Sequence, residues 1–157
     1  MTRILQKLIK LFIAFVLFTS CTSDAVYFNY QAINEKGWNK DSICTFDVKI
    51  ENASQSYDLY VNTRNRGEYP YQNIWLFIKE ISPDSAITND TIEFYLADEF
   101  GKWLGTGVGS VFNMPVLYRQ NFKFAKKGNY RFEIQQGMRD SLLVGINDVG
   151  IKVEKAK

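Results

Sequence analysis

The chain has 157 residues, nearly balanced charge and no histidine. The lack of histidine excludes Ser-His-Asp and Cys-His catalysis, histidine metal ligands and the commonest acid–base catalyst near neutral pH. With 15% aromatic residues and only three prolines, the composition is that of a folded, strand-rich protein. Three of the 19 basic residues lie in the first ten positions, so the rest of the chain lacks the basic excess expected of a nucleic-acid-binding protein.

Residues 1–20 have the anatomy of a lipoprotein signal peptide. A basic segment without acids precedes the apolar run 11–18, and two small residues stand directly before Cys21. This order is typical of a secretion signal, and the position of the cysteine predicts lipidation of Cys21. The run is far shorter than the roughly 20 residues needed to cross a bilayer core, which argues against a transmembrane anchor. A cleaved signal without lipid is the other alternative.

The remaining residues 21–157 are enough for one domain with its own core. We assign residues 21–26 to a lipidated tether and residues 27–157 to a β-sandwich domain. Once Cys21 carries lipid, Cys44 has no cysteine partner for an intramolecular disulfide. The strand pattern around Cys44 predicts an inert, buried thiol.

Short alternating segments separated by turn-forming residues follow one another along the chain. Predicted strands cover residues 27–33, 43–51, 57–64, 74–78, 90–97, 111–124, 130–136 and 142–154. In the second of these, Phe46, Val48 and Ile50 alternate with polar residues, the period of a half-buried strand. Pro115 is expected to break the extended stretch 111–124. About eight strands without helical periodicity predict an all-β fold, an antiparallel β-sandwich of jelly-roll or immunoglobulin-like topology.

Segment 74–78, I-W-L-F-I, is apolar on both faces, which predicts a central strand with Trp75 in the core. The stretch before it, residues 64–73, is the best candidate for a binding loop, because binding residues tend to lie on loops and Arg and Tyr dominate interface energetics. The alternative is that its tyrosines fold back and cover the end of the sandwich. The candidate partner-binding residues are Arg64, Arg66, Tyr69 and Tyr71.

Other possible sites are weaker. Residues 104–110 read L-G-T-G-V-G-S but lack the G-K-[ST] ending of a phosphate-binding loop. We therefore expect these glycines to serve tight turning or close backbone packing. The acidic residues do not form a calcium-loop motif, and no metal site or cofactor is expected.

Five segments of the chain carry a family resemblance. They read Y-P-Y-Q-N-I-W-L-F-I at 69–78, D-T-I-E-F-Y-L-A-D at 90–98 with G-K-W-L-G-T-G at 101–107, G-N-Y-R-F-E-I-Q-Q-G-M-R at 128–139 and L-V-G-I-N-D-V-G-I-K-V-E-K at 143–155. Together with the signal before Cys21, these segments resemble the gliding motility lipoprotein family GldH of the Bacteroidota. Each segment alone would be weak, and their combination is fairly specific.

The resemblance implies an outer-membrane lipoprotein, associated in gliding species with the gliding machinery and its linked secretion system. Relatives also occur in species that do not glide, where the role would be another envelope function. The family offers no catalytic residues to carry over, so we predict a non-enzymatic lipoprotein. We expect it to be held in the membrane by lipid, to face the periplasm, to bind other envelope proteins and to bind no nucleic acid. The alternative is a carbohydrate-binding envelope lipoprotein, suggested by the sandwich pattern and exposed aromatic residues. A hydrolase that uses only carboxylates is a weaker third hypothesis.

Overall fold

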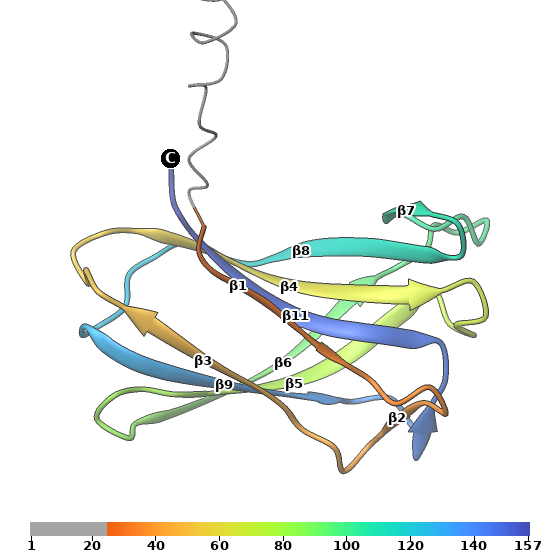
Figure 1. The fold of residues 1–157 in the computed structure, drawn as a ribbon, viewed down its shortest axis with the longest axis horizontal. Coiled ribbons are helices and arrows are strands. Elements are labelled where there is room, and N and C mark those ends of the chain that lie inside the picture. Colours follow the sequence, from red (N-terminus) through yellow and green to blue (C-terminus); the bar gives the residue numbers. More distant parts are fainter. Residues whose placement is uncertain (1–24) are drawn as a thin grey trace, which may run out of the picture.

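The computed structural model describes residues 25–157, which form strands joined by loops (Figure 1). The predicted signal peptide, Cys21 and the first part of the predicted tether lie outside the described residues. No helix in residues 25–157 is long and apolar enough to cross a membrane. The strands are β1 (Ala25–Ala32), β2 (Trp38–Asn39), β3 (Cys44–Ile50), β4 (Tyr57–Arg66), β5 (Asn73–Ile81), β6 (Ile87–Tyr95), β7 (Thr106–Val108), β8 (Val111–Phe122), β9 (Gly128–Gln136), β10 (Leu142–Leu143) and β11 (Ile146–Lys155).

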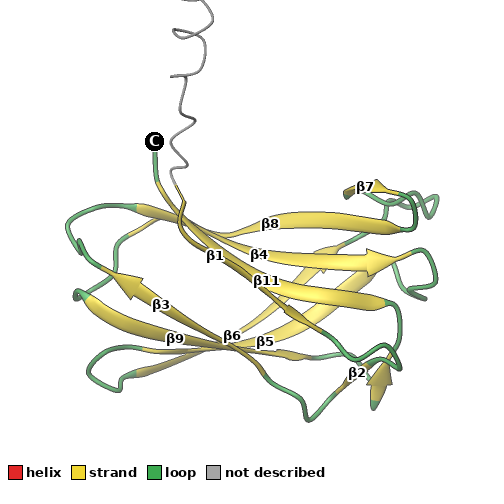
Figure 2. Cartoon of the chain, in the orientation of Figure 1, coloured by secondary structure: helices red, strands yellow, loops and turns green. Residues whose placement is uncertain are grey.

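Two antiparallel sheets pack face to face, as Figure 2 shows. Sheet 1 has the order β1-β11-β4-β8-β7, and sheet 2 has the order β3-β9-β5-β6. The short pair β2–β10 stands apart from both. The eight long strands cross between the sheets at every connection except the β5–β6 hairpin, which gives the jelly-roll topology. This confirms the all-β sandwich and selects the first of the two predicted topologies.

The alternation read from the sequence sets the core. In β3, Phe46, Val48 and Ile50 are buried, and the polar residues between them are exposed. Strand β9 pairs with β3 in a register that places Phe132 opposite Phe46, and both rings are fully buried. The period of two therefore predicted the inward face of these strands. Sheet 1 supplies the facing half of the core through β4 and β11.

Several predicted strand limits were wrong: β5 extends to Ile81 and not only to residue 78, and β6 begins at Ile87 and not at residue 90. Strand β1 begins at Ala25, which pairs with Glu154, so two residues assigned to the tether belong to the sheet. Strand β8 is continuous through Pro115, although a break was expected there. On one side β8 pairs with β4, but on the other side β7 covers β8 only from Val111 to Asn113. Pro115 thus lies in a part of β8 with one neighbouring strand among the described residues, where a missing N–H is tolerated.

The glycine-rich stretch serves close packing, as predicted. A Cβ on Gly107 would lie 2.1 Å from the carbonyl oxygen of Val111, so the tight β7–β8 hairpin requires glycine there. Cys44 is buried and forms no disulfide within the described residues. Burial raises the pKa of its thiol to about 11, which agrees with an inert structural cysteine.

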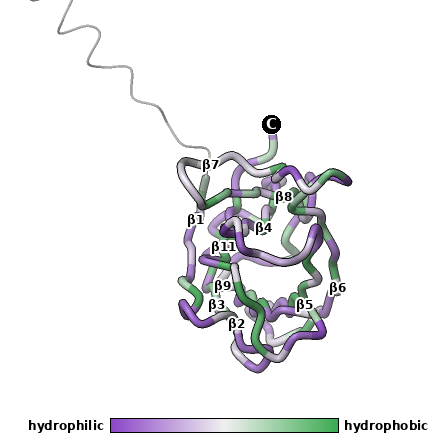
Figure 3. Tube along the Cα trace, turned by 90° about the vertical axis from the view of Figure 1, so that its right-hand side faces the viewer, coloured by the Kyte–Doolittle hydropathy of each residue, from purple (hydrophilic) through white to green (hydrophobic). Residues whose placement is uncertain are grey.

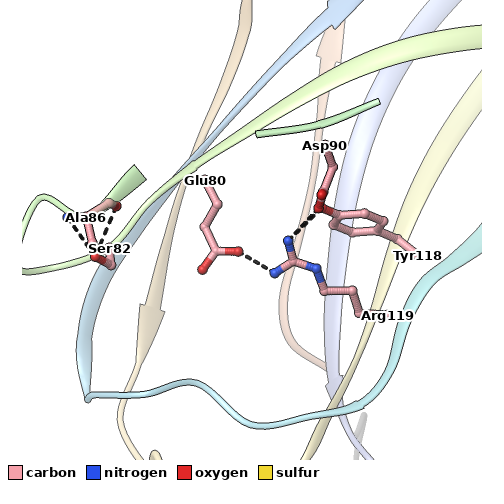
Figure 4. A network of polar contacts seen from close by, with 6 residues as sticks. All are labelled: Glu80, Ser82, Ala86, Asp90, Tyr118 and Arg119. Atoms are coloured by element: carbon pink, nitrogen blue, oxygen red, sulfur yellow. Dashed lines mark hydrogen bonds and ion pairs between the residues drawn. The ribbon is translucent and has the colours of Figure 1, made fainter. Parts of the chain in front are cut away.

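A polar cluster connects the two sheets inside the sandwich (Figure 4). The Arg119 guanidinium of β8 donates to the carboxylate of Glu80 on β5 and, over 2.7 Å, to Asp90 on β6. The Tyr118 hydroxyl also donates to Asp90. A bulge in β8 makes this possible: Leu59 faces Arg119 whereas Tyr60 faces residue 117, so one extra residue is inserted. Hydrogen bonds from Tyr118 and Arg119 lower the pKa of Asp90.

The sandwich has two ends that we name by the strand register. The terminal end contains the start of β1 and the end of β11, which pair at Ala25 and Glu154, together with the turns at residues 51–56, 82–86 and 123–127. The distal end contains the loops at residues 33–43, 67–72, 96–105 and 137–145. Figure 1 shows them at opposite sides of the molecule, and Figure 3 looks onto the distal end.

Candidate functional site

The predicted binding loop follows β4 at the distal end. Tyr69 is only 4% exposed, and its hydroxyl donates to the carbonyl oxygen of Asn73 over 2.8 Å. The loop lies tightly against the β10–β11 turn: a Cβ on Gly145 would be 2.6 Å from the Tyr69 Cα. Burial is the main cause of a strongly raised pKa for Tyr69. Tyr69 is therefore a core residue that fixes the shape of the loop.

Tyr71 lies at the surface, in contrast to the buried Tyr69. Its side chain is exposed, and its hydroxyl donates to the Asp140 carboxylate over 2.6 Å, which raises the pKa of Tyr71. Its ring meets that of Tyr69 edge to face with the centroids 5.9 Å apart. The two tyrosines thus divide the roles that were open in the sequence: Tyr69 covers the end of the sandwich and Tyr71 reaches the surface.

The two arginines lie in β4 and not in the loop. Arg64 places its guanidinium carbon 3.8 Å above the ring centroid of Tyr30, and a terminal nitrogen 3.7 Å from the Asp148 carboxylate. Arg66 pairs with Glu68 at 3.4 Å. Because Tyr30 and Asp148 belong to β1 and β11, Arg64 packs over sheet 1, whereas Tyr71 lies beside sheet 2. The structure therefore does not gather the four predicted residues on one surface.

An aromatic surface on sheet 2 was missed by the sequence prediction. Trp75 and Phe77 lie on the outer face of β5 and are 38% and 46% exposed, while Ile74, Leu76 and Ile78 fill the inner face. Placing Trp75 in the core was wrong. Strand β5 is indeed central, between β9 and β6, but no further strand or helix of residues 25–157 packs on its outer side. We call Tyr71, Trp75 and Phe77 the aromatic face.

The neighbouring strand leaves these rings accessible. The Gly137 N–H donates to the carbonyl oxygen of Trp75 over 2.7 Å, which places Gly137 directly beside Trp75. A Cβ on Gly137 would lie 3.2 Å from the Phe77 ring and 3.3 Å from the Trp75 Cβ. A larger residue at this position would therefore crowd the side chains of both Phe77 and Trp75. The glycine next to an alternating strand was the one sequence signal that pointed to this surface.

Two shallow grooves flank the aromatic face. The first, about 340 Å³, lies toward the distal end, and the second, about 360 Å³, lies on the other side of Phe77. Polar side chains border the rings. Glu93 on β6 is the register partner of Trp75 on β5, and Lys79 forms a 3.0 Å ion pair with Glu133. The first groove is lined by Tyr71, Asn73, Trp75, Gly137, Met138 and Arg139.

Further apolar side chains are exposed on the distal loops that adjoin the aromatic face. Phe100 is 87% exposed, the highest value among the large apolar side chains of residues 25–157. In the same residues, no group of three or more His, Cys, Asp or Glu side chains is placed to hold a metal ion. The arrangement offers a surface for contact, with aromatic rings at its centre and charges at its border. The other exposed large apolar side chains of the distal loops outside the aromatic face are Ile43, Leu104, Leu142 and Val144.

Comparison with known proteins identifies the family. The family described as GldH lipoprotein matches residues 25–153, which include seven of the eight long strands and all but the last two residues of β11. This chain belongs to the GldH lipoprotein family. The gliding motility lipoprotein GldH homolog of Christiangramia forsetii is 37% identical over 148 residues, which are 90% of each chain. The gliding motility lipoprotein GldH of Flavobacterium johnsoniae is 32% identical over 152 residues, 92% of this chain and 94% of the other.

The predicted family is thus confirmed, and as a GldH-family lipoprotein the chain is membrane-anchored. Among solved structures, a GH115 4-O-methyl-α-glucuronidase resembles 88% of this chain over 18% of its own length, with a TM-score of 0.43 and 10% identity. A likeness of this size carries no argument about function.

Proposed function

We propose that this chain is a non-enzymatic, protein-binding outer-membrane lipoprotein that faces the periplasm and is acylated on Cys21. Its role is in the gliding machinery, or in a related envelope function where the host does not glide. The observation that carries the binding role is the aromatic face, which leaves Trp75 and Phe77 exposed on a rigid sheet, with Tyr71 exposed on the adjoining loop.

The composition of this surface favours a protein partner. Interfaces concentrate aromatic and arginine side chains at a desolvated centre and keep a polar border. Here Trp75 and Phe77 form the centre, and the Lys79–Glu133 ion pair lies on the border. Inner-face packing holds β5, so little backbone order is lost on binding, which favours affinity.

The residues proposed from the sequence keep distinct parts in this surface. Tyr71 lines the first groove beside the aromatic face and would contact a partner directly. Tyr69 acts through the loop whose shape it fixes. Arg66 and Arg64 lie at the distal end of β4, on the side of sheet 1, where they would meet a partner large enough to extend around that end.

Capture of partners by the full-length, tagged lipoprotein from solubilised envelopes tests this function. We expect the double variant Trp75→Ala/Phe77→Ala to lose the recovered envelope proteins while its melting temperature stays close to that of the wild type. The matched control is Phe28→Ala/Leu117→Ala, since these two apolar side chains are similarly exposed but lie on sheet 1. Equal recovery by wild type and the first double variant would exclude the aromatic face as the binding surface.

A second candidate, carbohydrate binding, is favoured by one specific observation. Trp75 lies partly exposed on the outer side of sheet 2 beside Asn73 and Arg139, a combination of stacking surface and hydrogen-bonding groups that suits a sugar ring. Trp38 is fully buried, so fluorescence changes on glycan addition would report mainly on Trp75 and the half-buried Trp103. Saturable quenching by an envelope or plant glycan, abolished in Trp75→Phe, would favour this candidate over the first.

A further inference from the structure

The position of the predicted lipid limits where the membrane can be. Cys21 precedes Ala25, the first residue of β1, by only four residues. A polypeptide spans at most about 3.6 Å per residue, so the acylated cysteine lies within about 14 Å of the start of β1. The membrane surface must therefore be close to the terminal end of the sandwich.

The terminal end has more lysines than its acidic residues can neutralise. Three of its acidic residues each pair with a lysine: Glu51 with Lys49 at 3.1 Å, Asp84 with Lys126 at 2.6 Å, and Glu154 with Lys152 at 2.5 Å. Four more lysines at this end are exposed and form no ion pair within residues 25–157. They are Lys123 and Lys127 in the turn before β9, and Lys155 and Lys157 at the end of the chain.

A groove opens at the same end, next to the first residues of β1. Its volume is about 530 Å³, and it runs from Val26 past the loop at residues 51–56 to the end of β11. Lys155 lines it, together with the amide side chains of Asn52 and Gln55. Lys49 and Glu51 line it too, and they pair with each other at 3.1 Å, so Lys155 is the cation of the groove that no carboxylate neutralises among residues 25–157. Ammonium and amide donors around a hollow of this kind fit a phosphate group.

We propose that the terminal end docks on anionic phospholipid headgroups of the membrane that carries the lipid anchor. A headgroup phosphate occupies the groove beside Lys155, and the other unpaired lysines contact neighbouring headgroups. The proposal rests on the proposed acylation of Cys21, which brings this end to the membrane. Docking holds the sandwich upright, so that the distal end points away from the bilayer.

The energetic basis is the attraction of lysines to a negative membrane surface. Each lysine near such a surface raises the ratio of docked to undocked domain by about fivefold. The acyl chains supply the hold on the membrane but leave the domain free to tilt on its tether. The lysines therefore determine orientation and not attachment, which separates the two effects experimentally.

The experiment uses the full, acylated chain reconstituted in vesicles of phosphatidylcholine alone or of phosphatidylcholine with equal phosphatidylglycerol. A fluorescent label at Ser54→Cys reports on the terminal end, and one at Glu99→Cys reports on the distal end; both positions are exposed. The buried Cys44, whose thiol pKa is raised to about 11, does not compete for the label. Quenching by acrylamide, which is uncharged, measures accessibility.

With phosphatidylglycerol present, we expect quenching at Ser54→Cys to fall about twofold or more, and quenching at Glu99→Cys to stay constant. The triple variant Lys123→Glu/Lys127→Glu/Lys155→Glu should remove this protection. The matched distal variant Lys36→Glu/Lys40→Glu/Lys102→Glu, with the same change of charge, should retain it. Equal quenching at Ser54→Cys in both vesicle types, or protection that survives the first triple variant, would overturn the docking proposal.

Flotation of the unlabelled chain distinguishes this failure from failure of the anchor. Acylated protein floats with phosphatidylcholine vesicles whether or not the terminal end docks. Flotation only with phosphatidylglycerol would refute acylation and leave docking supported. No flotation with either composition would overturn both.

Discussion

The terminal end and the distal end of this sandwich differ in length of loop, in charge and in exposed apolar surface. The terminal end has short turns and unpaired lysines, and its large exposed apolar residues are Val26 and Ile87. The distal end has longer loops, and more of the exposed apolar side chains lie there, among them Phe100 and Leu104. If the terminal end docks on the membrane and the distal end contributes to partner binding, as proposed above, one rigid body keeps the two contacts apart, because both sheets run between the two ends.

The largest effect is expected at the anchor. Cys21→Ala should abolish incorporation of a radioactive fatty acid into the protein, because the thiol is the attachment point. Without lipid, the terminal end loses its fixed distance from the membrane. Label in the variant equal to that in the wild type would show that the terminal end is held in some other way.

Inside the sandwich, Arg119→Ala should remove the link between the sheets and leave Glu80, which is 7% exposed, without its cation. Loss of one partner of a buried pair costs about 3–5 kcal/mol, measurable by urea unfolding. Arg131→Ala is the control, since its pair with Asp47 is exposed and its loss should barely move the midpoint. If both variants unfold at the same urea concentration, the Arg119 cluster does not stabilise the sandwich.

At the distal end, the two tyrosines should separate stability from binding. Tyr69→Ala removes a buried ring and should cost about 3 kcal/mol, which lowers the melting temperature by roughly 6–12 °C. Tyr71→Ala removes an exposed ring and should weaken partner capture with little change in melting temperature. A large loss of stability in Tyr71→Ala would mean that the whole loop is structural.

Gly145→Ala tests the close packing of the loop at residues 67–72 against the turn between β10 and β11. Gly145 has φ +82°, and the new methyl group would meet the Tyr69 backbone, so we expect a loss of about 1–3 kcal/mol. Gly101→Ala has nearly the same φ, +80°, but open space around it. It should cost less, and the difference between the two melting temperatures measures the close approach alone. Equal losses would attribute the effect to φ and not to contact.

The smallest effect is a pH dependence centred on Asp90. Its pKa is lowered from an ordinary 3.8 by Tyr118 and Arg119, so its contribution to stability is complete above pH 3.8 and is lost as the pH falls through the lowered value. The stability difference between wild type and Asp90→Asn should therefore shrink on acidification below about pH 4. Asp41→Asn, in an exposed turn, provides the control. A difference that is constant with pH would contradict this role of Asp90.

The strands, and the inward faces of most of them, could be predicted from the sequence alone, because a period of two is a local property of the backbone. The alternation in β3 and β9 predicted which side chains are buried, and the lone Cys44 was correctly read as a buried thiol. The family, too, was predicted from sequence segments and confirmed by its relatives.

Which faces are covered, and which strands are neighbours, became clear only from the folded arrangement. Alternation places Trp75 and Phe77 on one side of β5, but whether another layer packs there depends on residues far away in the chain. Pro115 remains in a strand because of the limited extent of β7, and Arg119 reaches Glu80 because a bulge turns it inward. Each of these outcomes depends on contacts between segments distant in sequence, which local patterns do not encode.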